Sequence, residues 1–487
     1  VKVDLNQPEV SKEISILYDQ INEKIPSYFK LTKIRTTNIK DIQKLLKKDQ
    51  ILLDYYFFKN DLKVILISKD YFKIVSNNSN LKILNEINED IRETLFPDYN
   101  GIKPFAVNKS YNLNEKTFLF LNKITKDYKN IIVIPDGPLN SMPLHALAYA
   151  KNNDCLDCRN VQFNLDHHNF NYYPSVESFK NIDILDEEFK KISLNITKKI
   201  SEEVIDVVKQ PTLVKQLKKL KNKVLKEDKS KITKSENIIK TDDFYLGIGD
   251  PDLYSKIQVK KIDTSEKVTM LRSLFDKDKI SSQSIKEIYG PVDGSADEIN
   301  QVAEYLSPLK SKILLRENAK ETNLKELDLS SYKIIHFATH GEVSGAITGI
   351  NEPFLVLSPP NGPSAEDGLL TMSEIMALDT SANLVVLSAC NTAAGDETGS
   401  EGFSGLAKSF FMSGSKSILV SNWYVETYSA KEIVINLFKN LKDNPNFSIS
   451  YGLNLTMSEM AKNEKERSHP LFWAPFVVVG KNQPLFF

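Results

Sequence analysis

The chain has 487 residues, of which 41% are hydrophobic and 26% are charged, and its 63 basic side chains nearly balance its 64 acidic ones. This length predicts two or three domains, and the composition is typical of a folded globular protein. A formal net charge of -1 lacks the basic excess of a nucleic-acid-binding protein, and no apolar run reaches the ~18 residues of a membrane-spanning helix, so we expect neither nucleic-acid binding nor membrane insertion.

The cysteines indicate the compartment. Three are present: Cys155, Cys158 and Cys390. Such sparse use is expected in a reducing environment, and the N-terminus has no signal-peptide pattern, so we predict a cytoplasmic protein. Because the chain begins with Val1 and not with Met, we also expect it to be part of a longer product.

Cys155 and Cys158 form a Cys-x-x-Cys pair, and His167 and His168 follow nearby. This combination raises the question of a zinc site. A single pair and a non-standard histidine spacing do not favour zinc binding. We therefore expect two free thiols in a mobile, non-catalytic loop, and no metal or organic cofactor.

In chain order, the first predicted element is helical: residues 1–48 carry apolar side chains at helical spacing. Three short apolar runs joined by polar turns follow, at residues 51–57, 62–67 and 71–75, and predict an antiparallel β-meander. Farther along, residues 178–243 are rich in lysine and glutamate and have helical spacing with little strand character.

From residue 131 the pattern changes to that of a parallel α/β sheet. Short apolar runs that end in Gly, Pro, Asp or Ser alternate with helical stretches. The predicted strands are residues 131–135, 244–248, 312–315, 333–337, 354–357, 384–388, 417–420 and 476–479. The expected fold class is therefore α/β, with a mostly parallel sheet flanked by helices.

Two of these strands end in reactive side chains. His340 follows the strand at residues 333–337, and Cys390 follows the strand at residues 384–388. In open α/β sheets, sites form at the carboxyl ends of strands. Since one strand–helix excursion separates them, we expect the two strands to be neighbours and the two side chains to face each other. His336, within its strand, is expected to be a structural core histidine.

This pair suits nucleophilic catalysis. A thiol with a pKa of ~8.5 is only slightly ionised at neutral pH, so a nucleophilic Cys390 needs a nearby base. His340 can take the thiol proton and later protonate a leaving amine. The backbone N–H groups of Gly341 and Cys390 are the expected oxyanion hole. His340 lies about 50 residues before Cys390, which is the spacing found in caspases.

Several further motifs occur in a fixed order. They are HFATHG at 336–341, EPFLVLS at 352–358, GLLTMSEI at 368–375, LVVLSACNTA at 384–393, GSEGFSGLAK at 399–408 and HPLFWAPF at 469–476. Together they resemble the CHAT family, caspase-like peptidases that are related to separase and often fused to tetratricopeptide repeats. Weaker matches extend the resemblance to about residues 50–480. Thr392 departs from the caspase signature, which has Gly at that position, but is compatible with the CHAT pattern.

The resemblance implies a domain arrangement. A catalytic caspase-like half is expected at residues 311–487. An N-terminal half without catalytic residues, which includes the meander and the insert at 178–243, is expected at residues 49–310. The helical residues 1–48 would then be the end of a helical repeat region.

The resemblance also implies a function. We expect a cysteine endopeptidase that cleaves a protein partner and is controlled by an activating protein or effector complex. One alternative is a catalytically silent CHAT scaffold that acts as a protein-interaction module in signalling. A thiol-dependent hydrolase or transferase acting on small molecules is the other alternative.

The family's Trp-x-Val-Asp-Asp pattern is altered here, because residues 423–427 read WYVET. This loop follows the predicted strand at 417–420 and is expected to border the cleft. Ser421, Trp423 and Glu426 are therefore candidates for the substrate pocket. Asp396, in the acidic loop after Cys390, is a further candidate.

Replacing Glu426 by lysine is expected to change the preferred residue on the N-terminal side of the cleaved bond, since the substitution reverses the charge that the pocket presents. Profiling both proteins on a peptide library measures this preference. The same preference in both proteins removes Glu426 from the pocket.

Overall fold

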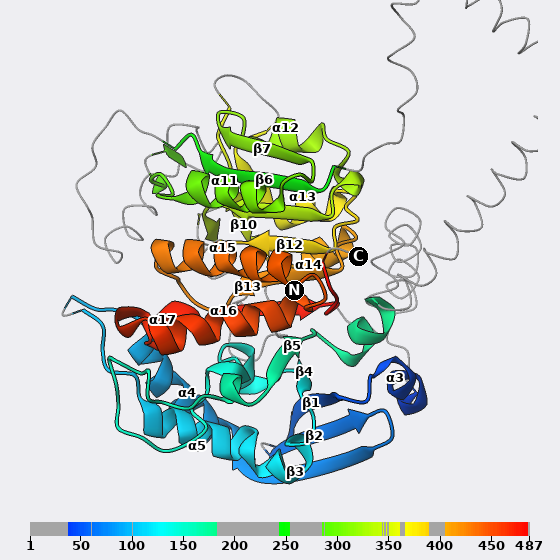
Figure 1. Ribbon diagram of the computed structural model, residues 1–487, viewed down its shortest axis with the longest axis vertical. Helices are drawn as coiled ribbons and strands as arrows, with labels where there is room; N and C mark the ends of the chain where they lie inside the picture. The colour runs from blue at the N-terminus through cyan, green and yellow to red at the C-terminus, as the bar shows by residue number, and fades with distance from the viewer. Residues whose placement is uncertain are drawn as a thin grey trace, which may run out of the picture. The chain divides into compact units, whose positions relative to one another are not determined.

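A single large sheet organises the chain. In the computed structural model it has eleven strands in the order β3-β2-β1-β4-β5-β14-β13-β12-β8-β6-β7 (Figure 1). In chain order its strands are β1 (Gln50–Phe58), β2 (Asp61–Ser68), β3 (Phe72–Asn80), β4 (Asn130–Ile134), β5 (Asn169–Tyr172), β6 (Tyr245–Pro251), β7 (Ser311–Arg316), β8 (Ile334–Ala338), β12 (Leu384–Leu387), β13 (Ser417–Ser421) and β14 (Phe476–Gly480). The structure describes residues 38–59, 61–99, 101–182, 243–253, 285–286, 288–342, 344, 347, 350–360, 366–388 and 405–485.

Most neighbouring strands of this sheet are parallel. The antiparallel pairs are β1 with β2, β2 with β3, and β13 with β14. Strands such as β12 (LVVL) and β14 (FVVVG) are buried along their whole length, as expected for a sheet that is covered on both faces. The predicted α/β class is therefore confirmed, and the β1–β2–β3 pairing confirms the meander.

Helices cover the sheet. They are α3 (Ile39–Leu45), α4 (Leu81–Arg92), α5 (Val107–Thr117), α6 (Asn122–Thr125), α11 (Ser295–Leu306), α12 (Glu321–Lys325), α13 (Met372–Ala377), α14 (Gly405–Met412), α15 (Thr427–Asp443), α16 (Ile449–Asn463) and α17 (Pro470–Trp473). Helices α11, α15 and α16 lie side by side over one face (Figure 1). The chain moves in opposite directions along the sheet from β6 to β7 and from β12 to β13, so right-handed crossovers place α11 and α14 on opposite faces.

A second, three-stranded sheet follows β8 in the chain. It consists of β9 (Gly341–Glu342), β10 (Phe354–Val356) and β11 (Leu369–Thr371), with β10 in the middle and both pairings antiparallel. The predicted strand at residues 354–357 was placed in the parallel sheet, and that placement is wrong. Its apolar residues are buried between β9 and β11, which sequence periodicity cannot distinguish from burial in the main sheet.

His336 is a core residue, as expected. Its side chain has no exposed surface, Nδ1 lies 2.9 Å from the hydroxyl of Tyr245, and Nε2 lies 2.8 Å from the Glu298 carboxylate. Glu298 comes from α11 and Tyr245 from β6. The histidine therefore ties a helix to two adjacent strands.

The contacts of the chain divide it into two units, one formed by Val1–Lys180 with Asp243–Phe487 and the other by Asn181–Asp242. The fold described here is that of the first unit. Residues 1–37, predicted to be helical, and residues 183–242 of the predicted insert lie outside the described residues. The domain boundary at residue 310 stays a prediction. Strand β6, from before that residue, lies between β7 and β8.

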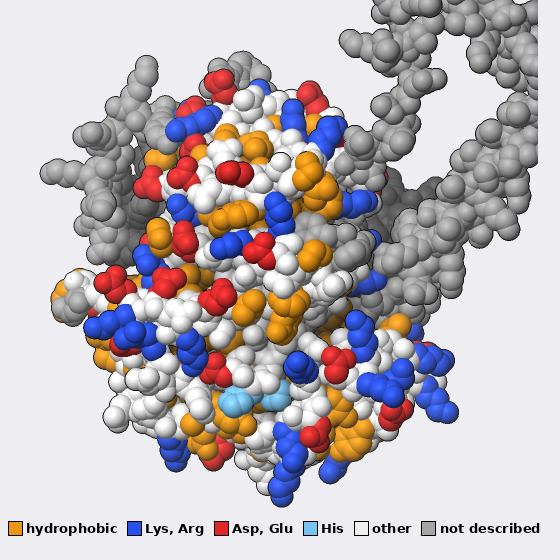
Figure 2. Space-filling model, in the orientation of Figure 1, with side chains coloured by type: hydrophobic (Ala, Val, Ile, Leu, Met, Phe, Trp, Pro, Cys, Tyr) orange, Lys and Arg blue, Asp and Glu red, His pale blue; other side chains and the backbone are white. Residues whose placement is uncertain are grey.

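Acidic, basic and apolar side chains are interspersed on the face that Figure 2 shows, as the near balance of charges would suggest. Among the described residues, no helix combines the length and the apolar character needed to cross a bilayer.

The loop with the two neighbouring cysteines differs from expectation. Cys155 and Cys158 form a disulfide, so the prediction of two free thiols is wrong. The loop is also attached on both sides: Cys155 and Phe105 exchange backbone hydrogen bonds of 2.8 and 3.3 Å, and the Cys158 N–H donates to Ser468 Oγ at 2.9 Å. These contacts with distant segments shape the turn that brings the two sulfurs together, and the spacing of the cysteines alone does not reveal them.

His145 is a second buried histidine, only 2% exposed. Its Nε2 donates to the Ala474 carbonyl at 2.9 Å, and Nδ1 lies 3.5 Å from the Tyr172 hydroxyl. Burial lowers the pKa of His145 to about 4. The imidazole is therefore neutral in the folded protein at pH values where the unfolded chain already binds a proton.

Replacing His145 by glutamine is expected to reduce the loss of stability on acidification. Between about pH 6.5 and pH 4 the wild type should lose free energy of unfolding relative to the variant, by about 3 kcal/mol at most, because only the unfolded wild type gains the histidine proton. Urea unfolding across this range measures the difference, and the comparison cancels groups present in both proteins. Parallel pH curves would contradict the assignment of a buried neutral His145.

Candidate active site

The order of the strands indicates where a site is expected. From β6 the chain moves outward through α11 to β7, whereas from β8 it moves the other way, to β12 and β13. These five strands are parallel, so their carboxyl ends share one edge of the sheet. In open α/β sheets, sites lie where the strand order reverses, and one such point is between the ends of β6 and β8 (Figure 1).

His340 follows β8 at this point. Its Nε2 lies 2.8 Å from the backbone carbonyl oxygen of Gly290, a residue of the segment that connects β6 to α11. A carbonyl oxygen can only accept a hydrogen bond, so Nε2 carries the proton. In the neutral ring Nδ1 then bears the lone pair and can act as a base. Gly290 was not identified from the sequence.

The segment around Gly290 is anchored by a small apolar core. This core packs the segment against β10 and β11 and consists of Leu253, Ile285, Ile288, Tyr289, Ile347, Phe354, Val356 and Leu369. The ring of Tyr289 also lies against His340, with 5.5 Å between ring centroids and 37° between ring planes. The same core therefore supports the histidine and the carbonyl that accepts its hydrogen bond.

Gly341 begins β9, the edge strand of the small sheet. The Val356 N–H donates to the His340 carbonyl at 2.9 Å. Hydrogen-bonded and non-hydrogen-bonded residue pairs alternate along an antiparallel ladder. The next pair, Gly341 with Leu355, is therefore a non-hydrogen-bonded pair, in which the N–H and C=O groups of each residue point away from the other strand. The Gly341 N–H is therefore directed away from β10, as the predicted oxyanion donor requires.

Cys390 lies outside the described residues, but the strand that leads to it is well defined. Strand β12 pairs with β8, which confirms that the two strands are neighbours, and Leu387 is aligned with Phe337. Counted from this pair, Cys390 and His340 each come three residues later. That the two side chains face each other stays a prediction.

The predicted pocket residues have different surroundings. Ser421 and Trp423 have no exposed surface, and the indole N–H of Trp423 donates to the Leu471 carbonyl at 3.2 Å. The Glu426 carboxylate caps α15 by accepting the N–H groups of Tyr428 at 3.1 Å and Ser429 at 2.9 Å. Asp396 lies outside the described residues. A role of these four residues in substrate binding stays a prediction.

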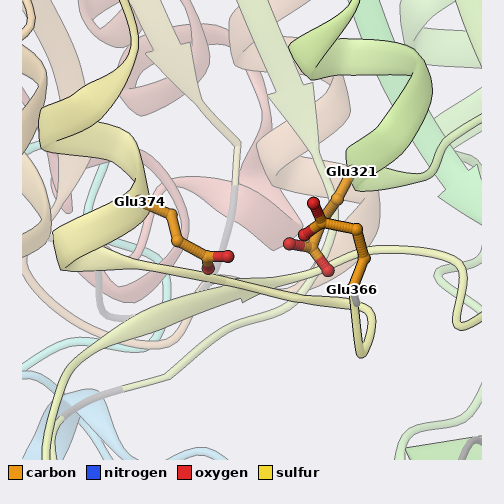
Figure 3. A group of neighbouring side chains, drawn as sticks. All are labelled: Glu321, Glu366 and Glu374. Carbon is orange, nitrogen blue, oxygen red and sulfur yellow. The ribbon is translucent and has the colours of Figure 1, made fainter. Parts of the chain in front are cut away.

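Three carboxylates gather at the N-terminal end of α12, whose first residue is Glu321. Glu321 and Glu366 face each other and Glu374 points toward them from α13, with their nearest oxygens within 4.8 Å (Figure 3). The Lys325 ammonium contacts Glu321 at 3.0 Å and Glu374 at 2.8 Å, and it also contacts Glu366. Burial raises the pKa of Glu321 to about 8. Since Lys325 supplies the positive charge, this donor set fits an internal ion-pair network better than a metal site.

The comparisons with known proteins agree with the sequence motifs. The family model described as CHAT domain matches residues 116–481, which confirms the resemblance. No curated protein sequence matches the chain.

Several solved structures are similar to this one. Separase of Saccharomyces cerevisiae, in complex with securin, has 10% sequence identity and a TM-score of 0.44, covering 91% of this chain and 30% of that chain. The Arg-specific cysteine proteinase gingipain R has 10% identity and a TM-score of 0.37, covering 82% and 70%. A complex of the pro- and mature domains of Porphyromonas gingivalis RgpB has 10% identity and a TM-score of 0.36, covering 82% and 71%. The chain thus spans only 30% of the length of the separase that it matches.

Replacing Lys325 by methionine is expected to lower the free energy of unfolding by about 2–4 kcal/mol at neutral pH, since the ionised carboxylates of Glu366 and Glu374 lose their counter-ion. The loss should shrink near pH 4, where the carboxylates take up protons. Urea unfolding at both pH values measures it. Lys312→Met, at an exposed position on β7, is the matched control. Equal stability of the two variants would show that Lys325 does not hold the cluster together.

Proposed function

The chain belongs to the CHAT-domain family, and we propose that it is a cysteine endopeptidase in which Cys390 is the nucleophile and His340 is the general base. The observation that carries this proposal is the 2.8 Å hydrogen bond from His340 Nε2 to the Gly290 carbonyl. It sets the tautomer in which Nδ1 is the basic nitrogen. It also orients the ring at the edge of the sheet where β12, the strand that precedes Cys390 in the sequence, ends.

The proposed reaction follows from these groups. His340 Nδ1 takes the proton of the Cys390 thiol, and the sulfur attacks the carbonyl carbon of the scissile peptide bond. When the tetrahedral intermediate collapses, the C–N bond breaks and the imidazolium gives its proton to the leaving amine. Water, deprotonated by the same nitrogen, then attacks the thioester and releases the acid. The thiol and the imidazole carry out every step, and the chemistry needs no cofactor.

Two features would stabilise the charges that develop. The imidazolium formed during the first step keeps its Nε2–H bond to the Gly290 carbonyl, whose dipole favours the positive ring. The oxyanion would accept hydrogen bonds from the N–H groups of Gly341 and Cys390, and each such donor typically contributes ~3 kcal/mol. The direction of the Gly341 N–H, away from β10, supports this role.

We further propose that the substrate is a protein and that an activating protein or effector complex controls the enzyme in the cytoplasm. The support is the family to which the chain belongs. A scaffold that keeps the fold without turnover is the competing function.

The wild type is expected to cleave a peptide library or host lysate, and His340→Ala and Cys390→Ala should each lower turnover by at least about 10²-fold because the base or the nucleophile is lost. Sequencing new N-termini identifies the cleaved bonds. His167→Ala, which removes an exposed histidine, is the matched control. If nothing is cleaved, labelling of Cys390 with a thiol probe decides: a reactive, His340-dependent thiol indicates an enzyme awaiting its activator, whereas an inert thiol indicates the scaffold.

A further inference from the structure

The disulfide between Cys155 and Cys158 closes a very short turn. Leu156 in this turn is 54% exposed and Cys155 is partly exposed, whereas Cys158 is buried. A cross-link over so few residues restricts the unfolded chain only weakly, so it contributes less to global stability than a disulfide that closes a long loop. Its main effect is therefore on the local shape of the turn.

The buried end of the turn holds a second segment of the chain. The Cys158 N–H donates to Ser468 Oγ at 2.9 Å, and Ser468 has no exposed surface. The Ser468 hydroxyl also lies 3.0 Å from the Lys465 carbonyl oxygen, to which it can donate. Because a buried polar group that loses its partner is costly, the position of Ser468 depends on the direction of the Cys158 N–H.

The other end of the turn reaches the same segment by a different route. Cys155 and Phe105 exchange backbone hydrogen bonds, and the Phe105 ring lies edge-on to the His469 ring, with 5.8 Å between centroids. His469 Nδ1 accepts the Leu471 N–H at 3.1 Å, and its Nε2 lies 3.1 Å from the Lys103 carbonyl oxygen. The two ends of the turn are thus tied, directly or through Phe105, to the two residues that precede α17.

Both tryptophans of the chain are hydrogen-bonded to this segment. The Trp473 indole N–H donates to the Ser468 carbonyl at 2.9 Å, and the Trp423 indole N–H donates to the Leu471 carbonyl at 3.2 Å. Neither tryptophan has any exposed surface. A displacement of residues 468–471 therefore changes the surroundings of both indole rings.

Trp423 connects this segment to the edge of the sheet that bears the candidate active site. It belongs to the loop between β13 and α15. Strands β8, β12 and β13 are parallel, so this loop leaves the sheet at the edge that also bears His340. The preceding residue, Asn422, donates its backbone N–H to the Pro475 carbonyl at 2.9 Å. Two successive residues of the loop are thus bonded to the chain that follows Ser468.

We propose that the Cys155–Cys158 disulfide is a site of reduction by a dithiol, and that its redox state controls the position of residues 468–473 and of the loop that contains Trp423. A thiolate of the dithiol attacks the partly exposed Cys155 sulfur, the S–S bond breaks, and Cys158 leaves and takes up a proton. The second thiol of the reductant then attacks the mixed disulfide, which frees Cys155 and converts the reductant to its own disulfide. Two electrons and two protons pass to the protein.

Reduction acts through the turn. Once the cross-link is open, the exposed turn can rearrange, the direction of the Cys158 N–H is no longer fixed, and Ser468 loses its donor. The inference goes beyond the proposed function, because it concerns the contacts around α17 and its test measures no cleavage. Failure of either proposal leaves the other standing.

The experiment follows the two indole N–H signals of the full chain by nuclear magnetic resonance after transfer to deuterated buffer. The oxidised protein is compared with protein reduced by dithiothreitol, and the mass after alkylation of free thiols shows which form is present. Reduction should speed exchange of both indole N–H groups by about 5-fold or more, because their opening no longer has to break the bond between Cys158 and Ser468.

Three variants act as controls. The double variant Cys155→Ser, Cys158→Ser should exchange as fast as the reduced wild type and should not respond to dithiothreitol. Ser468→Ala keeps the disulfide but removes the hydroxyl that the Cys158 N–H contacts, so the exchange of the Trp473 indole should lose most of its response to reduction. Cys390→Ala keeps both cysteines of the turn and should respond as the wild type does.

Equal exchange rates in the oxidised and reduced wild type would overturn the inference. A pair of cysteines that cannot be converted between the disulfide and dithiol forms in the folded protein would overturn it as well. A response that persists in the double variant would place the effect elsewhere, with the same consequence. If the variants do not fold, the two forms of the wild type still decide, because that comparison needs no substitution.

Discussion

The pairing of β6 with β8 is the constraint on which the candidate site depends. The two strands are parallel, with Gly249 aligned to Ala338, and the chain leaves their carboxyl ends in opposite directions along the sheet. The edge of the sheet between those ends therefore receives one connection from each strand. The connection after β6 delivers Gly290, and the connection after β8 delivers His340.

The partner of His340 is a backbone carbonyl, where many hydrolases use a carboxylate. A carbonyl dipole favours the protonated ring less than the full charge of a carboxylate would. A side chain can be replaced by mutation, whereas a carbonyl is present at every residue and only its direction has to be controlled. Neighbouring side chains therefore have to hold the carbonyl in the right direction. In this protein the apolar core that contains Tyr289 packs next to the Gly290 carbonyl in the chain.

Much of this arrangement could be predicted because it is local in the sequence. Strands β8 and β12 were predictable from their apolar runs. The candidate site was predictable from the reactive residues that follow these two strands. Gly290 could not be found, since its role depends on a contact between residues 50 positions apart. Strand β5 was missed because its two asparagines break the apolar pattern; the amide of Asn171 instead donates to the Gly480 carbonyl at 2.9 Å. The role of Glu426 as a helix cap likewise depends on where α15 begins.

Strand β14 is the last strand in the chain, yet it lies near the middle of the sheet, between β5 and β13. During synthesis, β5 and β13 therefore each keep a bare edge until residues 476–480 have left the ribosome. Both edges belong to buried strands, and such edges readily pair with other chains when they are exposed. Completion of the sheet thus competes with aggregation in the newly made protein, and loss of these five residues would leave two half-sheets, each with an exposed edge.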